Sequence, residues 1–108
     1  MIKKEEEFFH VMEEIIRLLL SYNFKDGAVK LERKLHEYQR TDDLEQKFEI
    51  LQTISNYYGG MGSINDIYFS QGDSNKLDAD NKYLHELLNR LFDLTGIVQK
   101  AIRVKQAN

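Results

Sequence analysis

Histidines and carboxylates are the side chains of this sequence to consider first for chemistry. Glu7 and His10 have the Glu-x-x-His spacing of di-iron bundles, but such sites need a second pair, and the sequence contains no second pair. His85 and Glu86 begin like a zinc-protease motif, in which Asn89 occupies the place of the required second histidine. We therefore expect no metal site, and we interpret the histidines as exposed or capping residues.

An oxygen-rich run near residue 75 resembles a calcium-binding loop in composition. The run contains Asp73, Asn75, Asp78 and Asp80. An EF-hand loop that began at Asp73 would need glycine at the position of Asp78 and a bidentate glutamate at the position of Leu84. Neither requirement is met, so we interpret the run as a polar loop that ends in a helix cap.

A glycine cluster is the most unusual local feature. Glycine-rich loops can cradle phosphates with their backbone amides. A Walker loop would need a lysine after Gly62, however, and a dinucleotide loop would need a preceding strand. We favour a turn that ends a helix, with Gly59 or Gly60 in the left-handed conformation. Because loops often carry function, we also keep the cluster as a candidate functional loop. Its residues are Gly59, Gly60, Met61, Gly62, Ser63, Asn65 and Asp66.

The remaining side chains do not suggest a nucleophile. The chain has no cysteine, which excludes disulfides, thiolate metal sites and thiol nucleophiles. Its serines have no histidine nearby in the sequence, and none lies in a recognised nucleophile elbow. We predict that the protein is not an enzyme and that it uses no cofactor.

Four stretches with helical periodicity must position these side chains. Apolar residues recur at steps of three and four over residues 3–21, 26–39 and 43–58. A fourth stretch begins at a cap, Asp78 or Asp80, and continues to about residue 105. The simplest arrangement is all-α, a compact bundle of about four helices with one long Gly-rich loop between the third and the fourth. Residues 64–69 could form a short strand or a helix.

Length, hydropathy and charge limit the class of protein. The 108 residues are typical of a single helical domain, residues 1–108. Charged residues interrupt the first apolar cluster, so it cannot be a signal core or a membrane span. We therefore expect a cytoplasmic protein that does not bind a membrane. The formal net charge of −3 argues against binding of nucleic acid, because such binding depends on neutralising phosphates.

The glycine cluster also carries a resemblance to a family. The run Gly60-Met61-Gly62-Ser63-Ile64-Asn65-Asp66 resembles the Gly-Met-Gly-Ser-apolar-Asn-Asp signature of a family of small, uncharacterised bacterial proteins. The resemblance implies a bacterial origin and a shared loop, and it implies no chemistry. Some small families of this kind act as immunity or antitoxin partners of bacterial toxins.

These observations together predict a protein-interaction module with a protein as its partner, and the resemblance implies the immunity or antitoxin type. The surface we expect to bind that partner consists of Tyr57, Tyr58, Tyr68, Phe69, Asp73 and Asp78, since aromatic side chains anchor interfaces and aspartates steer a basic partner.

Two alternatives remain open at this point. The fourth stretch has a wide apolar face that could form a homodimer, and Gly96 within it marks either close packing or a break in the helix. The glycine loop could instead bind a small ligand with Asn65 and Asp66.

Overall fold

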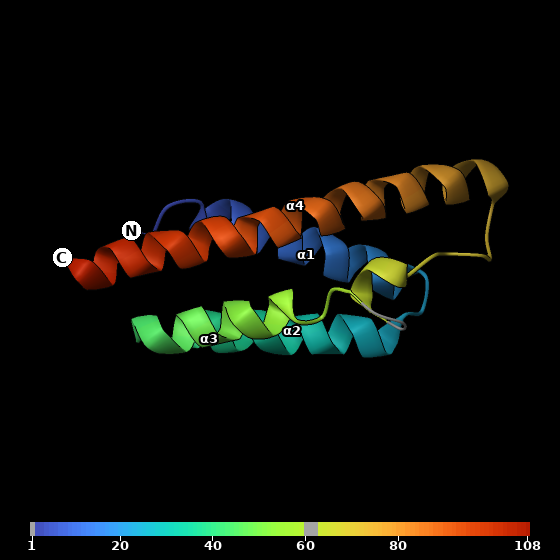
Figure 1. Ribbon diagram of the computed structural model, residues 1–108. Coiled ribbons are helices and arrows are strands. Elements are labelled where there is room, and N and C mark those ends of the chain that lie inside the picture. Colours follow the sequence, from blue (N-terminus) through green and yellow to red (C-terminus); the bar gives the residue numbers. More distant parts are fainter. Residues whose placement is uncertain (1, 60–62) are drawn as a thin grey trace.

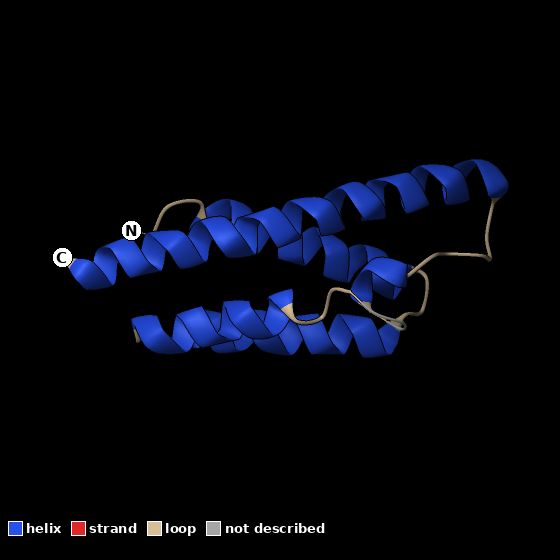
Figure 2. Cartoon of the chain, viewed as in Figure 1, coloured by secondary structure: helices blue, strands red, loops and turns tan. Residues whose placement is uncertain are grey.

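The computed structural model describes residues 2–59 and 63–108, which form helices joined by short connections (Figure 1). The α-helices are α1 (Glu5–Ser21), α2 (Lys25–Arg40), α3 (Leu44–Ser55) and α4 (Ser74–Ala107). A short 3₁₀ helix, η1 (Ile64–Asp66), lies between α3 and α4, and the described residues contain no strand (Figure 2). The predicted all-α bundle of about four helices is confirmed. In this part of the chain, none of the helices combines the length and the hydropathy that crossing a membrane requires.

The bundle is elongated because α4 runs along its whole length. Its principal extents are 51, 25 and 20 Å. α1 and α2 form an antiparallel hairpin, α3 packs beside α2, and α4 packs against α1 and α3. In Figure 1, α4 lies at the top and α2 and α3 lie at the bottom, and the two termini lie at the same end of the molecule.

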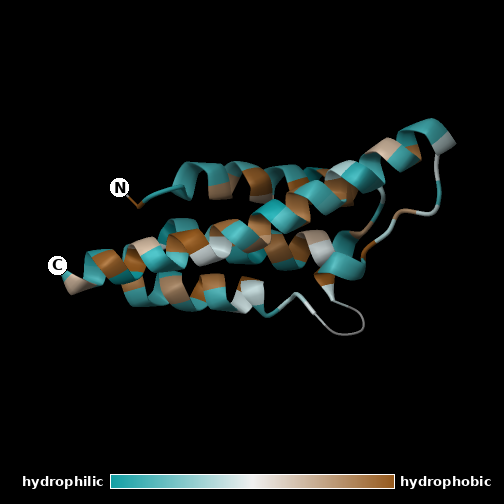
Figure 3. Cartoon of the chain, turned by 45° about the horizontal axis from the view of Figure 1, so that its top comes forward, coloured by the Kyte–Doolittle hydropathy of each residue, from teal (hydrophilic) through white to brown (hydrophobic). Residues whose placement is uncertain are grey.

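Each α-helix buries one stripe of apolar side chains in a shared core. In α1, Phe8, Met12 and Ile15 are wholly buried, and their spacing of three and four places them on one face. Burial of one such side chain contributes roughly 1.5–3 kcal/mol. Figure 3 shows the apolar stripes alternating with polar surface along the helices. The longest stripe belongs to α4 and consists of Leu84, Leu88, Leu91, Leu94, Val98 and Ile102.

Charged side chains in the first turn of α1 connect this helix to the other three. Glu5 accepts hydrogen bonds from the Tyr38 hydroxyl of α2 (2.7 Å) and from the Lys47 Nζ of α3 (3.2 Å). The Arg90 guanidinium of α4 donates two hydrogen bonds, 2.6 and 2.8 Å long, to the Glu7 carboxylate. The glutamates of this turn therefore fix the relative positions of the helices in addition to suiting the positive end of the α1 dipole.

Two helix boundaries, the start of α4 and the end of α3, lie three or more residues from the sequence-based expectation. α4 begins at Ser74 because the Asp73 carboxylate accepts hydrogen bonds from the Asn75 and Lys76 amides, so the predicted start at Asp78 or Asp80 is wrong. α3 begins after Asp43, whose carboxylate accepts from the Gln46 amide. The same helix ends at Ser55 rather than at residue 58.

Candidate functional site

The segment after α3 is closed at its base by hydrogen bonds. The Ile64 amide donates to the Tyr57 carbonyl oxygen (2.9 Å), which joins the two ends of the glycine-rich stretch. The Asn65 Oδ1 accepts from the Gly59 amide (3.3 Å) and from the Ser63 hydroxyl. Asn65 therefore acts as a turn residue.

Gly59 has the positive φ, +83°, expected for one of the two glycines that follow α3. The helix itself ends earlier, at the Asn56 cap, which is right-handed. Gly59 therefore serves the turn that follows the cap and does not form the helix end. Asp66 lies in η1 and is exposed. The other members of the predicted loop, Gly60, Met61 and Gly62, lie outside the described residues.

A groove lies between the first half of α2 and this closed segment, and we call it the α2 groove. Its volume is about 570 Å³. The α2 side contributes side chains that sequence analysis did not single out, and the other side contributes Tyr57, Ser63 and η1 with the residue after it. The lining residues are Phe24, Asp26, Gly27, Val29, Lys30, Arg33, Tyr57, Ser63, Ile64 and Ile67.

The α2 groove combines exposed apolar side chains with positive charge. Phe24 and Val29 are 37% and 50% exposed. The Lys30 Nζ lies 4.4 Å from the centre of the Tyr57 ring, a cation–π contact. Burial raises the pKa of the Tyr57 phenol, so it stays a neutral hydrogen-bond donor at physiological pH. Arg33 forms no ion pair with any residue that the structure describes.

Residues 67–72 cross from η1 to α4, and a buried aromatic residue holds them against the bundle. Phe69 is wholly buried. Its amide donates to the Asn81 Oδ1 (2.7 Å), and the Asn81 Nδ2 donates to its carbonyl oxygen (2.8 Å). The Tyr22 ring stacks on the Phe69 ring, with centroids 3.9 Å apart and planes 8° apart. Phe69 is a core residue, so its predicted place on a partner surface is wrong.

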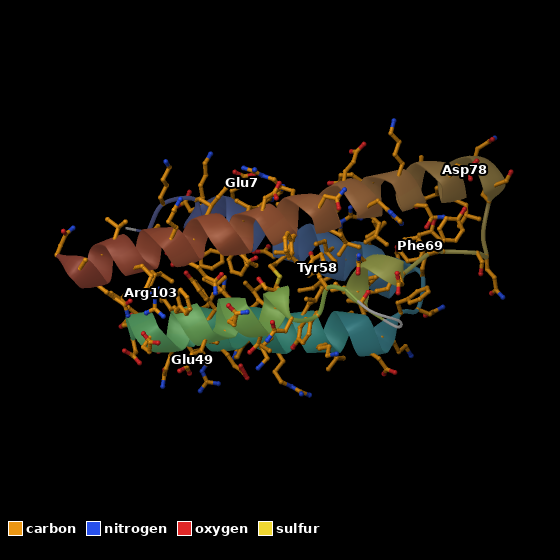
Figure 4. All side chains as sticks on the ribbon, in the orientation of Figure 1. Glu7, Glu49, Tyr58, Phe69, Asp78 and Arg103 are labelled. Atoms are coloured by element: carbon orange, nitrogen blue, oxygen red, sulfur yellow. The ribbon has the colours of Figure 1, made fainter. Side chains whose placement is uncertain are left out.

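The other predicted surface residues do not form one patch. The Tyr58 hydroxyl donates to the Leu88 carbonyl oxygen (2.7 Å), and burial raises the pKa of this phenol. Asp73 caps α4. Tyr68, 59% exposed, and Asp78 remain on the surface, but Figure 4 places Tyr58 in the middle of the bundle and Asp78 at the far tip of α4. The predicted six-residue surface is therefore corrected to a set of residues with separate roles, of which Tyr57 lines the α2 groove.

Some signals in the sequence could have identified the residues that were missed. Val29 is an apolar residue outside the buried stripe of α2, which consists of Ala28, Leu31, Leu35 and Tyr38, and an apolar side chain on a polar face can mark a binding surface. Asn81 precedes Leu84 by three residues, which places it in register with the buried stripe of α4. The groove itself gives no local signal, because its two sides are about thirty residues apart in the sequence.

The histidines are dispersed in the fold. His10, His36 and His85 lie on three different helices, α1, α2 and α4, and all three are exposed. Among the residues with described positions, no group of three or more metal-ligating side chains is close enough to hold a metal ion. Within the described residues, the candidate functional site is therefore the α2 groove and not a histidine cluster.

Comparison with known proteins identifies a family for the part of the chain that contains this groove. A family model described as a domain of unknown function (DUF6966) matches residues 24–78, which is just over half of the chain. The chain belongs to the DUF6966 family. The DUF6966 match begins at Phe24 and includes every residue that lines the α2 groove. It does not include α1 or most of α4. No curated protein and no solved structure matches the chain.

Proposed function

We propose that this protein is a non-catalytic protein-interaction module that binds a segment of its partner in the α2 groove. One observation carries the proposal. Exposed apolar side chains, an aromatic ring and an arginine without an ion-pair partner in the described chain line the same groove. Aromatic residues and arginine are the side chains that most often dominate the binding energy of protein interfaces.

The shape of the α2 groove favours a protein segment over a small ligand. Sites for small molecules enclose most of the surface of their ligand. The α2 groove is only partly enclosed, so a small molecule bound there would keep part of its surface in water. A protein segment covers such a groove from above and gains apolar contacts with Phe24 and Val29 at the rim.

The side chains of the α2 groove also define the chemistry of the segment. Lys30 and Arg33 provide two positive charges, and Asp26 is the one acidic residue that lines the groove. A carboxylate on the partner would pair with the Arg33 guanidinium, whose fork can bind it through two hydrogen bonds. An apolar side chain next to that carboxylate would fill the space between Val29, Ile64 and Ile67.

The biological setting of this binding belongs to the same proposal. The resemblance of the Gly-Met-Gly-Ser-apolar-Asn-Asp run to a bacterial family supports a cytoplasmic immunity or antitoxin protein, whose partner is a toxin. In such a protein, binding itself is the activity, because the module blocks a surface of the toxin.

Photo-crosslinking in the native host tests the proposal. A photo-reactive phenylalanine analogue is introduced at Val29 in one variant and at Tyr68 in another, and crosslinked proteins are identified by mass spectrometry. Both positions are exposed, but only Val29 lines the α2 groove. We expect one protein to crosslink at Val29 and not at Tyr68. We also expect Arg33→Glu to abolish that crosslink, because it places like charges together.

The control keeps the same change of charge away from the groove. Lys82→Glu reverses an exposed charge on α4 and should leave the crosslink intact. Crosslinks at Tyr68 alone, or a Val29 crosslink that survives Arg33→Glu, would overturn the proposal.

A further inference from the structure

A second surface lies on a solvent-exposed side of the C-terminal half of α4, and we call it the α4 trough. One hollow of about 620 Å³ lies between this helix and the start of the chain, with Ile2, Ile97 and Val104 among its lining residues. A second hollow continues along the helix to Phe92 and shares Ile97 and Lys100 with the first. Phe92 and Val104 are 50% and 60% exposed. The trough therefore exposes apolar surface over about 18 Å of helix, at 1.5 Å per residue.

Lysines surround the hollow near the C-terminus of α4. Lys3, Lys100 and Lys105 line it, and no acidic residue does. These lysines form no ion pair within the described ranges, 2–59 and 63–108. This charge is opposite in sign to the formal net charge of the chain, −3. A second copy of the chain docked symmetrically here would bring like charges together, which costs free energy. The three lysines outweigh Asp93, the one acidic residue among those that line the two hollows, so the charge favours an acidic partner.

The fold itself does not explain why a glycine, Gly96, lies at this surface. It lies within the uninterrupted helix α4 and lines the second hollow. Its φ is not positive, and a Cβ added there would meet no atom within 4 Å. Alanine would therefore fit, and it is the better helix former. A glycine on an open helix face permits close approach of another backbone, so Gly96 is consistent with a partner that lies directly against α4.

The secondary structure of the partner follows from the backbone of this surface. The amides and carbonyls of α4 are hydrogen-bonded within the helix over this range, so they cannot pair with an extended strand. A helical partner segment satisfies its own backbone internally and therefore suits this surface. A helix that lies along α4 can place apolar side chains at every third and fourth position against Phe92, Ile97 and Val104. Acidic residues that flank this stripe would face the lysines.

We propose that the α4 trough binds an acidic amphipathic helix of a partner protein. This surface lies outside residues 24–78 and is separate from the α2 groove, so the inference does not depend on the function proposed for that groove.

A designed peptide tests the inference. The probe is a fluorescein-labelled helical peptide of eighteen residues with leucines on one face and glutamates on both flanks, and binding is followed by fluorescence anisotropy. One control peptide has the same composition in shuffled order, and another has lysine in place of glutamate. We expect only the acidic amphipathic peptide to bind, with an affinity that falls as salt rises.

Variants of the protein locate the binding. Lys100→Glu with Lys105→Glu should weaken peptide binding at least tenfold. Lys76→Glu with Lys82→Glu reverses two charges on the exposed N-terminal part of the same helix and should change it less than twofold. Gly96→Ala should raise Tm because alanine favours the helix, and it should weaken binding at least threefold because its methyl group separates the two helices.

Several outcomes would overturn the inference. These are equal binding of the shuffled peptide, insensitivity to the Lys100 and Lys105 reversals, and a Gly96→Ala variant that binds as well as the parent. Flotation with vesicles of phosphatidylserine and phosphatidylcholine, in the absence of peptide binding, would assign the surface to a membrane. A dimer in sedimentation velocity that the Lys100 and Lys105 reversals alter would assign it to self-association. Loss of peptide binding on Arg33→Glu would instead place the peptide in the α2 groove.

Discussion

Asn81 holds the course of residues 67–72 through two hydrogen bonds with the backbone of Phe69. Asn81 is 5% exposed, so neither group of Phe69 would gain easy access to water if the amide were removed. Each buried unsatisfied backbone group costs about 1–3 kcal/mol. We expect Asn81→Ala to lower the free energy of unfolding by about 3 kcal/mol in urea denaturation. Asn89→Ala, at an exposed site of the same helix, should change it by less than about 0.5 kcal/mol. Equal effects of the two changes would show that Asn81 does not hold the segment.

The ion pair between Glu7 and Arg90 makes the stability of the fold depend on pH in the acid range. The Arg90 guanidinium, through its hydrogen bonds and charge, holds the pKa of Glu7 below the ordinary value of 4.5. Because the pKa is lower in the folded state, the pair stabilises the protein fully above pH 4.5, and this contribution is lost as the pH falls through the lowered pKa. The contribution is small, since more than a third of each side chain is exposed and water screens the pair. Thermal unfolding of Glu7→Gln should show a lower Tm at pH 7 and a shallower decline toward pH 3 than the parent.

The neighbouring residue provides the control for this prediction. Glu6 is exposed and forms no ion pair among the residues described. Glu6→Gln should therefore leave the pH profile of Tm close to that of the parent. A Glu7→Gln profile that runs parallel to the parent profile would contradict the assigned role of the pair.

At the scale of elements, α4 begins at the edge of the core, where Leu77 packs against the core and stays partly exposed. Its first buried residue is Asn81, so Asp73 must stabilise the first turns by capping. We expect Asp73→Ala to cost about 1 kcal/mol locally, visible as faster amide hydrogen exchange at residues 75–80. Asp78→Ala, one turn into the same helix, should have little effect on exchange. If both variants exchange alike, the capping role of Asp73 is wrong.

The first turns of α4 also show which parts of the fold could not be predicted from the sequence. Phe8, Met12 and Ile15 repeat at helical spacing, and that spacing was sufficient to predict α1. The first turns of α4 have no such repeat, because they lie at the edge of the core with only Leu77 packed against it, so the sequence predicts a loop there. The sequence predicts Phe69 at the surface, because no local pattern reports its contact with Asn81, twelve residues away. The α2 groove required knowledge of how α2 and residues 57–67 pack together.

At the scale of the whole molecule, the family match and the folding core do not coincide. Residues 24–78 contain the α2 groove and the turn at Asn65. The side chains that complete the core come mainly from outside this range, from α1 and from the part of α4 beyond residue 78. They are Phe8, Val11, Met12, Ile15, Ile16, Leu18 and Leu19 of α1, and Leu84, Leu87, Leu88, Leu91, Leu94, Val98 and Ile102 of α4. The matched range contains the α2 groove, and the flanking helices contribute most of the buried side chains of the core.

This division predicts the behaviour of the matched range in isolation. A peptide of residues 24–78 would keep α2 and α3, which have 16 and 12 residues, near the length at which isolated helices are marginal in water. Without α1 and most of α4, Leu31, Tyr38 and Ile54 would lose part of the apolar surface that buries them. We expect the peptide to show weak helical circular dichroism and no cooperative thermal transition, whereas the full chain unfolds cooperatively. If the peptide unfolded cooperatively, the α2 groove would belong to an autonomous unit, and α1 and α4 would be additions to it. If it does not, the groove exists only where flanking helices complete the core, and any partner that binds there recognises the whole bundle.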